Sequence, residues 1–150
     1  IASLVTQGHL IEQEAEAADP ELLLSFFQSE LGQRAGRALA LRKEIPFNLM
    51  LPLRELPAFA EADSDDTIIV QGTIDCCFEE EDGLVLLDYK SNYIGEENQE
   101  ERVRELTELY RGQISLYCRA LAEYSGREVK VAYLYLFGIG REIEIRSSRR

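Results

Sequence analysis

The stretch that decides the fold runs from Gly72 to Lys90 and reads GTIDCCFEEEDGLVLLDYK. It contains two apolar runs separated by the acidic turn Glu79–Gly83, which is the pattern of a β-hairpin. We expect one strand over Ile68–Phe78 and a second over Leu84–Tyr89. The second strand is apolar on both faces, which is typical of a strand in the middle of a sheet. The sequence therefore predicts an antiparallel hairpin at the centre of a sheet.

Further helices and strands precede and follow this hairpin. We expect helices over Gln13–Ala18, from Asp19-Pro20-Glu21 to about Leu31 and from about Glu100 to Tyr124, and strands over Leu41–Leu51, Val129–Phe137 and Glu142–Arg146. Apolar side chains at helical spacing predict a buried face on the second helix: Leu22, Leu23, Phe26, Phe27 and Leu31. Pro46 favours an edge position for its strand, and strict alternation favours an edge for the last strand. This order of elements predicts an α/β fold in one domain over residues 1–150.

Composition narrows the class of protein. The chain has 150 residues and a hydrophobic share of 45%, which suits one globular domain. The longest apolar run, about Val131–Phe137, is far shorter than the roughly 20 residues that span a bilayer, which excludes a membrane protein. Cys76, Cys77 and Cys118 are an odd number of cysteines, which argues against a disulfide framework and favours a reducing cytoplasm. Because Ile1 is not Met and no leader follows it, we expect a fragment of a longer protein.

The net charge of −12 argues against nucleic-acid binding, because contacts to phosphate normally require a basic patch. Much of the acidic charge lies in three runs, Glu61–Asp66, Glu79–Asp82 and Glu96–Glu101. Each run is interpreted as a solvated loop or the start of a helix. The average charge therefore does not decide the charge of a single cleft.

Two carboxylates and a lysine converge on the predicted hairpin. If its turn is centred between Glu81 and Asp82, antiparallel pairing places Asp75 opposite Asp88, with Cβ atoms about 5 Å apart. A centre one residue later places Asp75 opposite Lys90 and diagonal to Asp88. Alternation puts Asp88 and Lys90 on one face of their strand, so the three groups are neighbours in either register.

Facing carboxylates in an apolar sheet are destabilising unless a positive charge lies between them. A divalent cation suits this position, and oxygen ligands favour Mg²⁺ or Mn²⁺ over zinc, which prefers histidine and cysteine. Lys90 can orient a water or stabilise charge that develops on a phosphate. These groups together predict a site for hydrolysis of phosphodiesters.

Asp75 and Asp88-Tyr89-Lys90 resemble the signature of the PD-(D/E)XK nucleases, in which two acids and a lysine lie on a central hairpin. The resemblance implies a restriction-endonuclease-like core, an α/β fold whose mixed sheet has a central antiparallel hairpin flanked by helices. It also implies that Asp75, Asp88 and the backbone carbonyl of Tyr89 hold Mg²⁺ or Mn²⁺, and that Lys90 is catalytic.

Tyr110-Arg111-Gly112-Gln113, followed by Tyr117, resembles the Q-x-x-x-Y element of the RecB branch of this family. Gln113 and Tyr117 share a helix face. The resemblance places them among the catalytic residues, where they help to hold DNA or the other catalytic side chains, with Tyr110 and Arg111 as further DNA contacts. Leu41–Leu53 resembles the strand that precedes the site in bacterial helicase–nuclease subunits. The likeness spans nearly the whole chain and is closest to their carboxy-terminal nuclease domain.

This resemblance implies partners and a setting. Within an ATP-dependent helicase–nuclease complex of the bacterial cytoplasm, the domain is expected to cut DNA as an exonuclease during recombinational repair of double-strand breaks. The helicase motor delivers a single strand, and a second helicase–nuclease subunit completes the complex. Members of the branch usually carry a metal-binding histidine upstream of the matching region; His9 is interpreted as a polar loop residue instead. No helicase motif is found in the chain.

Other interpretations of these residues stay open at this point. Gln113 and Tyr117 also fit a plain helix stripe with a buried amide and a core tyrosine. Glu44 fits either an outer carboxylate of the metal site or a solvated partner of Arg42 or Lys43, and Arg111 and Arg119 fit phosphate contacts or solvated charges. No iron–sulfur cluster is expected, because three cysteines fall short of four ligands. The rival to a nuclease is a catalytically silent domain that docks or guides DNA.

Overall fold

The computed structural model describes residues 20–56, 59, 61 and 65–145. The elements are α3 (Pro20–Gln28), α4 (Glu30–Arg37), β1 (Ala40–Pro52), η1 (Leu53–Glu55), β2 (Thr67–Glu80), β3 (Gly83–Lys90), α5 (Gln99–Ser125), β4 (Val129–Leu136), η3 (Phe137–Ile139) and β5 (Arg141–Ile145). The helix expected over Gln13–Ala18, His9 and Arg146 lie outside the described residues. Gly126, with φ 67°, ends α5 in the left-handed conformation, as its stop signal predicts.

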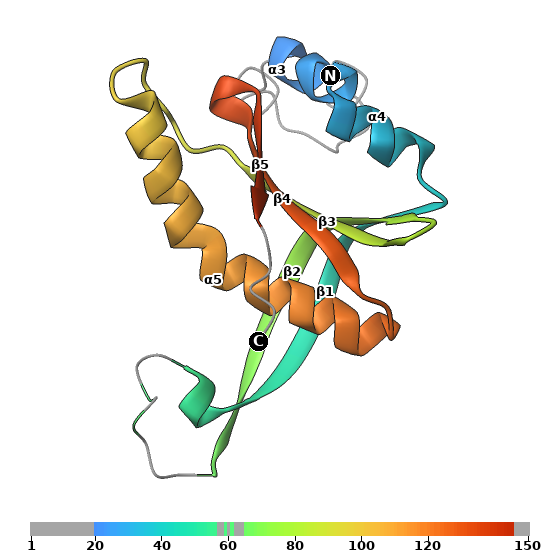
Figure 1. Ribbon diagram of the computed structural model, residues 1–150, viewed down its shortest axis with the longest axis vertical. Helices are drawn as coiled ribbons and strands as arrows, with labels where there is room; N and C mark the ends of the chain where they lie inside the picture. The colour runs from blue at the N-terminus through green and yellow to red at the C-terminus, as the bar shows by residue number, and fades with distance from the viewer. Residues whose placement is uncertain (1–19, 57–58, 60, 62–64, 146–150) are drawn as a thin grey trace, which may run out of the picture.

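The five strands form one mixed sheet in the order β1-β2-β3-β4-β5 (Figure 1). β3 and β4 are parallel and the other neighbours are antiparallel. The hairpin of β2 and β3 therefore lies at the centre, and β1 and β5 are the edges, as predicted. β1 and β2 extend beyond the other strands as a two-stranded arm (Figure 1).

The register of the central hairpin is the first of the two expected registers. Its pairs run from Glu80↔Gly83 to Cys76↔Leu87, which centres the turn between Glu81 and Asp82. The turn is shorter than predicted, because β2 continues through Glu80 and leaves two residues between the strands. This register makes Asp75 and Asp88 the next positions along the two strands.

Helices cover both faces of the sheet and divide the core into layers (Figure 1). Between α5 and the sheet lies a cluster that includes Ile74, Cys77, Leu86, Ile114, Cys118 and Leu134. On the opposite face, α3 and α4 pack on a cluster that includes Phe26, Leu31, Cys76, Phe78, Leu87 and Tyr135. The flanking helices of the predicted α/β fold are thereby confirmed. None of the described helices has the length and apolar character needed to cross a membrane.

The helix expected to end near Leu31 is instead two helices. Ser29 breaks it: the side-chain oxygen of Ser29 accepts a hydrogen bond from the amide of Gly32 at 3.1 Å and caps α4. Gly32 permits this tight junction, since a Cβ there would lie 2.0 Å from the carbonyl oxygen of Phe26. The predicted buried face is confirmed for Phe26 and Leu31, whereas Leu23 and Phe27 are exposed.

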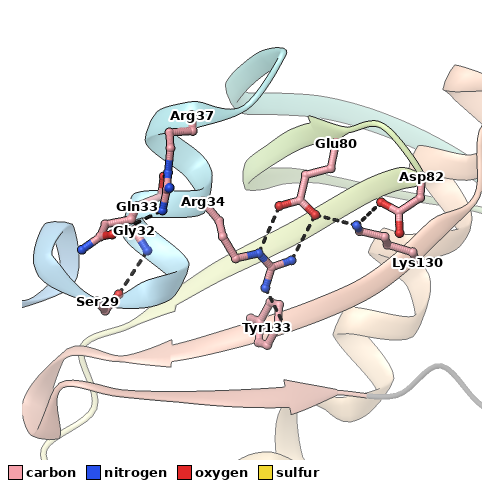
Figure 2. A network of polar contacts seen from close by, with 9 residues as sticks. All are labelled: Ser29, Gly32, Gln33, Arg34, Arg37, Glu80, Asp82, Lys130 and Tyr133. Carbon is pink, nitrogen blue, oxygen red and sulfur yellow. Dashed lines mark hydrogen bonds and ion pairs between the residues drawn. The ribbon is translucent and has the colours of Figure 1, made fainter.

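A polar network fastens α4 to the end of the hairpin (Figure 2). Arg34 donates two hydrogen bonds to the carboxylate of Glu80, at 3.0 and 3.2 Å, and one to the hydroxyl of Tyr133. Lys130 forms ion pairs with Glu80 and Asp82. Chiefly because of Arg34, the pKa of Glu80 is lowered to about 2. The interpretation of this acidic run as solvated is therefore wrong for Glu80, whose side chain is 23% exposed, whereas Asp82 is exposed in the turn as expected.

Candidate active site

Asp88 is the buried acid of the site. It follows the apolar run of β3, and its side chain is on the α5 side of the sheet with 1% of its surface exposed. Burial raises the pKa of Asp88; the contact with Lys90 opposes this rise, and the negative charge of Asp75 adds to it. Its buried Oδ2 atom forms a charge-assisted contact with Nζ of Lys90 at 2.6 Å and has no other donor among the described residues. The carboxylate therefore lacks part of the stabilisation that a buried charge needs.

Asp75 lies where the pairing of β2 with β3 ends. Instead of a further backbone pair, Oδ2 of Asp75 accepts a hydrogen bond from the amide of Tyr89 at 2.9 Å. This bond takes the place of the next rung of the ladder and holds the half-buried carboxylate beside β3. The register makes Asp75 and Asp88 neighbouring positions, and the negative charge of Asp75 adds to the rise in the pKa of Asp88.

Lys90 joins the two acids to α5. Its Nζ atom lies 2.6 Å from Oδ2 of Asp88 and donates a hydrogen bond to Oε1 of Gln113 at 3.1 Å. The same atom lies 4.3 Å from the centre of the Tyr110 ring, within the range of a cation–π contact. Only 15% of the Lys90 side chain is exposed, so its charge is directed into the site.

The face of α5 that carries Tyr110, Gln113 and Tyr117 is turned toward the hairpin. Gln113 binds Lys90, and the hydroxyl of Tyr110 donates to Oδ1 of Asn92 at 3.2 Å. The pKa of Tyr117 is raised by burial first and then by the charges of Asp88 and Asp75. Tyr110 and Tyr117 also pack against the core cluster between α5 and the sheet, as the helix-stripe interpretation expects.

Three other candidates lie away from these contacts. Arg111 forms an ion pair with Glu108 at 2.8 Å on the exposed surface of α5. Arg119 is similarly engaged by acidic side chains of α5 and η1. Glu44 is exposed in β1. The structure therefore brings together Asp75, Asp88, Tyr89, Lys90, Tyr110, Gln113 and Tyr117, and it leaves Arg111, Arg119 and Glu44 outside this group.

Phe47 and Gly72 support the site and were not singled out from the sequence. The ring of Phe47 meets the ring of Tyr117 edge-on, with centroids 5.4 Å apart. Gly72 is the β2 partner of Phe47, and a Cβ at Gly72 would lie 2.8 Å from the Phe47 ring. The glycine thus leaves the space in which Phe47 packs against Tyr117. Its place three residues before Asp75 was the available signal.

Gly72→Ala is expected to disturb Tyr117 through Phe47. Because the new Cβ would meet the ring at 2.8 Å, Phe47 must move toward Tyr117 or the strands must separate. We expect a loss of about 1–3 kcal/mol in the free energy of unfolding, which thermal unfolding measures. Gly36→Ala is the control, because a Cβ at Gly36 has nothing within 4 Å. Equal stability of the two variants would contradict this packing role.

The residues present fit a weakly held, hydrated divalent cation. In the part of the chain that the structure describes, no group of three or more His, Cys, Asp or Glu side chains could hold a metal ion. Two carboxylates are nevertheless sufficient for Mg²⁺, which usually keeps several waters and binds through one or two carboxylates. Oδ2 of Asp88, which is buried and lies 2.6 Å from the Lys90 ammonium, is the atom that such a cation would share with Lys90.

Comparison with known proteins identifies homologues. No family model matches the chain. It is 40% identical over 148 residues to a protein of Clostridium novyi, 40% over 145 residues to one of Thermoanaerobacter sp. and 38% over 143 residues to one of Acetivibrio thermocellus. All three are named as the A subunit of an ATP-dependent helicase/nuclease. The matches cover 94–96% of this chain but only 11–12% of the length of each relative.

Proposed function

We propose, from its homology to a segment of the A subunit of ATP-dependent helicase/nucleases (AddA), that this chain is a metal-dependent deoxyribonuclease domain of the RecB-like PD-(D/E)XK type. The observation that carries the proposal is the buried carboxylate of Asp88, paired with Lys90 and influenced by Asp75. A mixed sheet with a central hairpin is compatible with the restriction-endonuclease-like core of that family.

In this proposal each side chain has a defined role. Asp75 and Asp88 bind Mg²⁺ or Mn²⁺, together with the backbone carbonyl of Tyr89. The cation supplies positive charge for the reacting phosphate and lowers the pKa of a bound water. Lys90 orients the attacking water or stabilises charge on the phosphate, and Gln113 holds the Lys90 ammonium in position. Tyr117, which shares a face of α5 with Gln113, positions the DNA strand.

The acidic composition suits delivery of DNA by another part of a longer protein. With a net charge of −12, the chain has little general attraction for phosphate. We propose that a helicase motor of the same polypeptide delivers a single strand and that a second helicase–nuclease protein takes part, during repair of double-strand breaks in the bacterial cytoplasm. A salt titration of DNA binding tests this: tight, steeply salt-dependent binding by the chain alone would contradict it.

A silent domain that only docks or guides DNA is the alternative function. Loss of an acid or of the lysine is the expected mark of such a domain. Here Asp75, Asp88 and Lys90 are all present, and Asp88 and Lys90 are in contact. A purely structural role would leave the charge of Asp88 buried without a cation, and it predicts no stabilisation by metal.

Mn²⁺ or Mg²⁺ is expected to stabilise the chain and to activate cleavage. A cation at a concentration of 100 times its Kd, bound to the folded state alone, raises the free energy of unfolding by about 2.7 kcal/mol. Thermal unfolding in EDTA and in increasing MnCl₂ measures this shift, and labelled single-stranded DNA reports cleavage. Asp75→Asn should remove both effects.

Each outcome selects one function. Stabilisation with metal-dependent cleavage supports the nuclease. Stabilisation without cleavage favours the silent domain. Neither effect in a folded chain favours the structural role and contradicts the proposal.

A further inference from the structure

Beside the candidate site, β1 and β2 each have one position at which the alternation of side chains between the two faces of the sheet is interrupted. In a regular strand, residues three apart point to opposite faces. Ile74 and Cys77 of β2 nevertheless both belong to the cluster that packs against α5. Arg42 and Ile45 of β1 line one pocket together with Leu121 of α5. Each strand therefore has one residue at which the alternation slips.

The two slips lie opposite each other. The register of β1 with β2 is the same on both sides, with the pairs Lys43↔Cys76 and Ile45↔Ile74. Between these pairs lie Glu44 and Asp75, which the ladder skips. Because each strand has one such residue, the pairing register is the same before and after it. The side chains of both strands change faces of the sheet at this position.

Glu44 has a backbone conformation that matches this slip. Its φ of 49° is in the left-handed region, which a side-chain-bearing residue rarely adopts within a strand. Of the described residues other than glycine, only Glu44 and Asn98, which precedes α5, have positive φ. Strained backbone of this kind persists where the surrounding structure enforces it, and it gathers at functional sites.

The interrupted alternation leaves Asp75 without a ladder pair to β1. The carboxylate of Asp75 accepts the amide hydrogen of Tyr89 in the neighbouring strand. Ile74, the preceding residue, belongs to the core cluster on the α5 face, whereas Cys76, the following residue, belongs to the cluster on the opposite face. The backbone at Glu44 and the direction of the Asp75 side chain are thus parts of one local arrangement.

We propose that Glu44 is a positioning residue, whose left-handed backbone conformation lets Asp75 leave the ladder and reach Tyr89 and the cation site. The link between this role and DNA cleavage rests on the proposed function, whereas the effect of Glu44 on the position of Asp75 does not. The role belongs to the backbone, because the carboxylate of Glu44 is exposed and no described group of three acidic, cysteine or histidine side chains could hold a metal.

Substitutions that differ in their tolerance of positive φ test the proposal. Glycine adopts this conformation readily, asparagine tolerates it, alanine does so less well and β-branched valine resists it. Glu44→Gly, Glu44→Asn, Glu44→Ala and Glu44→Val form the series. Glu44→Gln removes only the charge, and Lys43→Val places a valine at the neighbouring exposed position of β1.

Two readouts follow Asp75 without depending on cleavage. Hydrogen exchange of the Tyr89 amide reports its bond to Asp75, and the Mn²⁺ concentration that produces half of the rise in Tm reports the cation site. We expect Gly, Asn and Gln at position 44 to match the parent chain within about 2-fold in both. Valine should speed Tyr89 exchange and raise the Mn²⁺ requirement about 10-fold or more, with alanine between, whereas Lys43→Val should change neither.

The series decides the proposal in each case. If Glu44→Val prevents folding, the order of Gly, Asn and Ala still carries the comparison. Unchanged Tyr89 exchange in Glu44→Val and Glu44→Ala would overturn the proposal. Equal losses in Gly, Asn and Gln would overturn it as well, since they would assign the role to the carboxylate. A chain that cuts no DNA but keeps the expected order would contradict the nuclease function and leave the positioning role supported.

Discussion

Asp88→Asn is expected to abolish cation binding and DNA cleavage while it stabilises the metal-free chain at neutral pH. Asparagine keeps the size of the side chain but has no charge for a cation. We expect cleavage to fall at least about 1,000-fold, which corresponds to about 4 kcal/mol of transition-state stabilisation. The metal-free chain should become more stable, because Asp88 has only 1% of its surface exposed and a buried charge is costly.

The gain in stability has a defined dependence on pH. Burial is the main reason that the pKa of Asp88 is raised in the folded chain. Protonated Asp88 therefore favours folding, and this contribution is fully present below the unfolded pKa of about 3.9 and is lost as pH rises through the folded pKa. Asp88→Asn has no carboxyl group at this position, so its free energy of unfolding does not fall in this way as pH rises. Its advantage in free energy of unfolding should be small near pH 4 and should grow toward pH 7.

Thermal unfolding in EDTA between pH 4 and pH 7.5 measures this difference. For a chain of this length, about 1 kcal/mol corresponds to a Tm shift of about 2–4 °C. Asp82→Asn is the matched control, because Asp82 is exposed in the turn of the same hairpin and is paired with Lys130. A variant at position 88 that is less stable than the parent chain at pH 7 would contradict the view that Lys90 alone does not fully compensate this buried charge.

The sequence was sufficient to predict the hairpin, to limit its register to two alternatives and to place Asp88 and Lys90 on one face. These features depend on local information: an acidic turn between two apolar runs locates the turn to within one residue, and alternation puts Asp88 and Lys90 on one face. The edge positions of β1 and β5 follow from Pro46 and from the alternation of the last strand. Each prediction needed only residues that are close in the chain.

What the sequence did not predict depends on contacts between distant segments. The helix break at Ser29 has a local signal in Ser29-Glu30, but the apolar residues on either side suggested one continuous helix. The exposure of Leu23 and Phe27 could not be inferred, because helical spacing shows that a face is apolar without showing what covers it. The slip at Glu44 and Asp75 involves both strands at once, and alternation within either strand alone does not reveal it.

Lys90→Met is expected to abolish cleavage while cation binding is retained or strengthened. Methionine keeps the unbranched apolar stem that packs beside Tyr110 but has no ammonium group. If Lys90 orients the attacking water or stabilises the phosphate, its loss should lower the cleavage rate about 100- to 10,000-fold. The cation should bind at least as well, because the Lys90 Nζ atom lies 2.6 Å from Oδ2 of Asp88 and its charge opposes a second positive charge there.

Metal-free Lys90→Met should also be less stable than the parent chain. Removing one partner of a buried ion pair leaves the other charge uncompensated, which costs up to about 3–5 kcal/mol. Protonation of Asp88 relieves part of this loss, so the deficit should shrink toward acidic pH, where the carboxylate is neutral. Mn²⁺ should restore stability at neutral pH by supplying the missing positive charge. Unfolding in EDTA and in MnCl₂, with cleavage assays alongside, measures all of these effects.

Lys130→Met is the control, because Lys130 is also paired with acidic side chains but belongs to the network around Glu80, away from the site. It should lose some stability and keep both cation binding and cleavage. Asp88→Asn and Lys90→Met should therefore share the loss of cleavage but shift the metal-free Tm and the cation affinity in opposite directions. If Asp88 and Lys90 form only a structural ion pair that holds the sheet to α5, both substitutions should destabilise the chain and neither variant should respond to metal. Shifts of opposite sign in the metal-free Tm would therefore distinguish a metal-dependent nuclease site from such a pair.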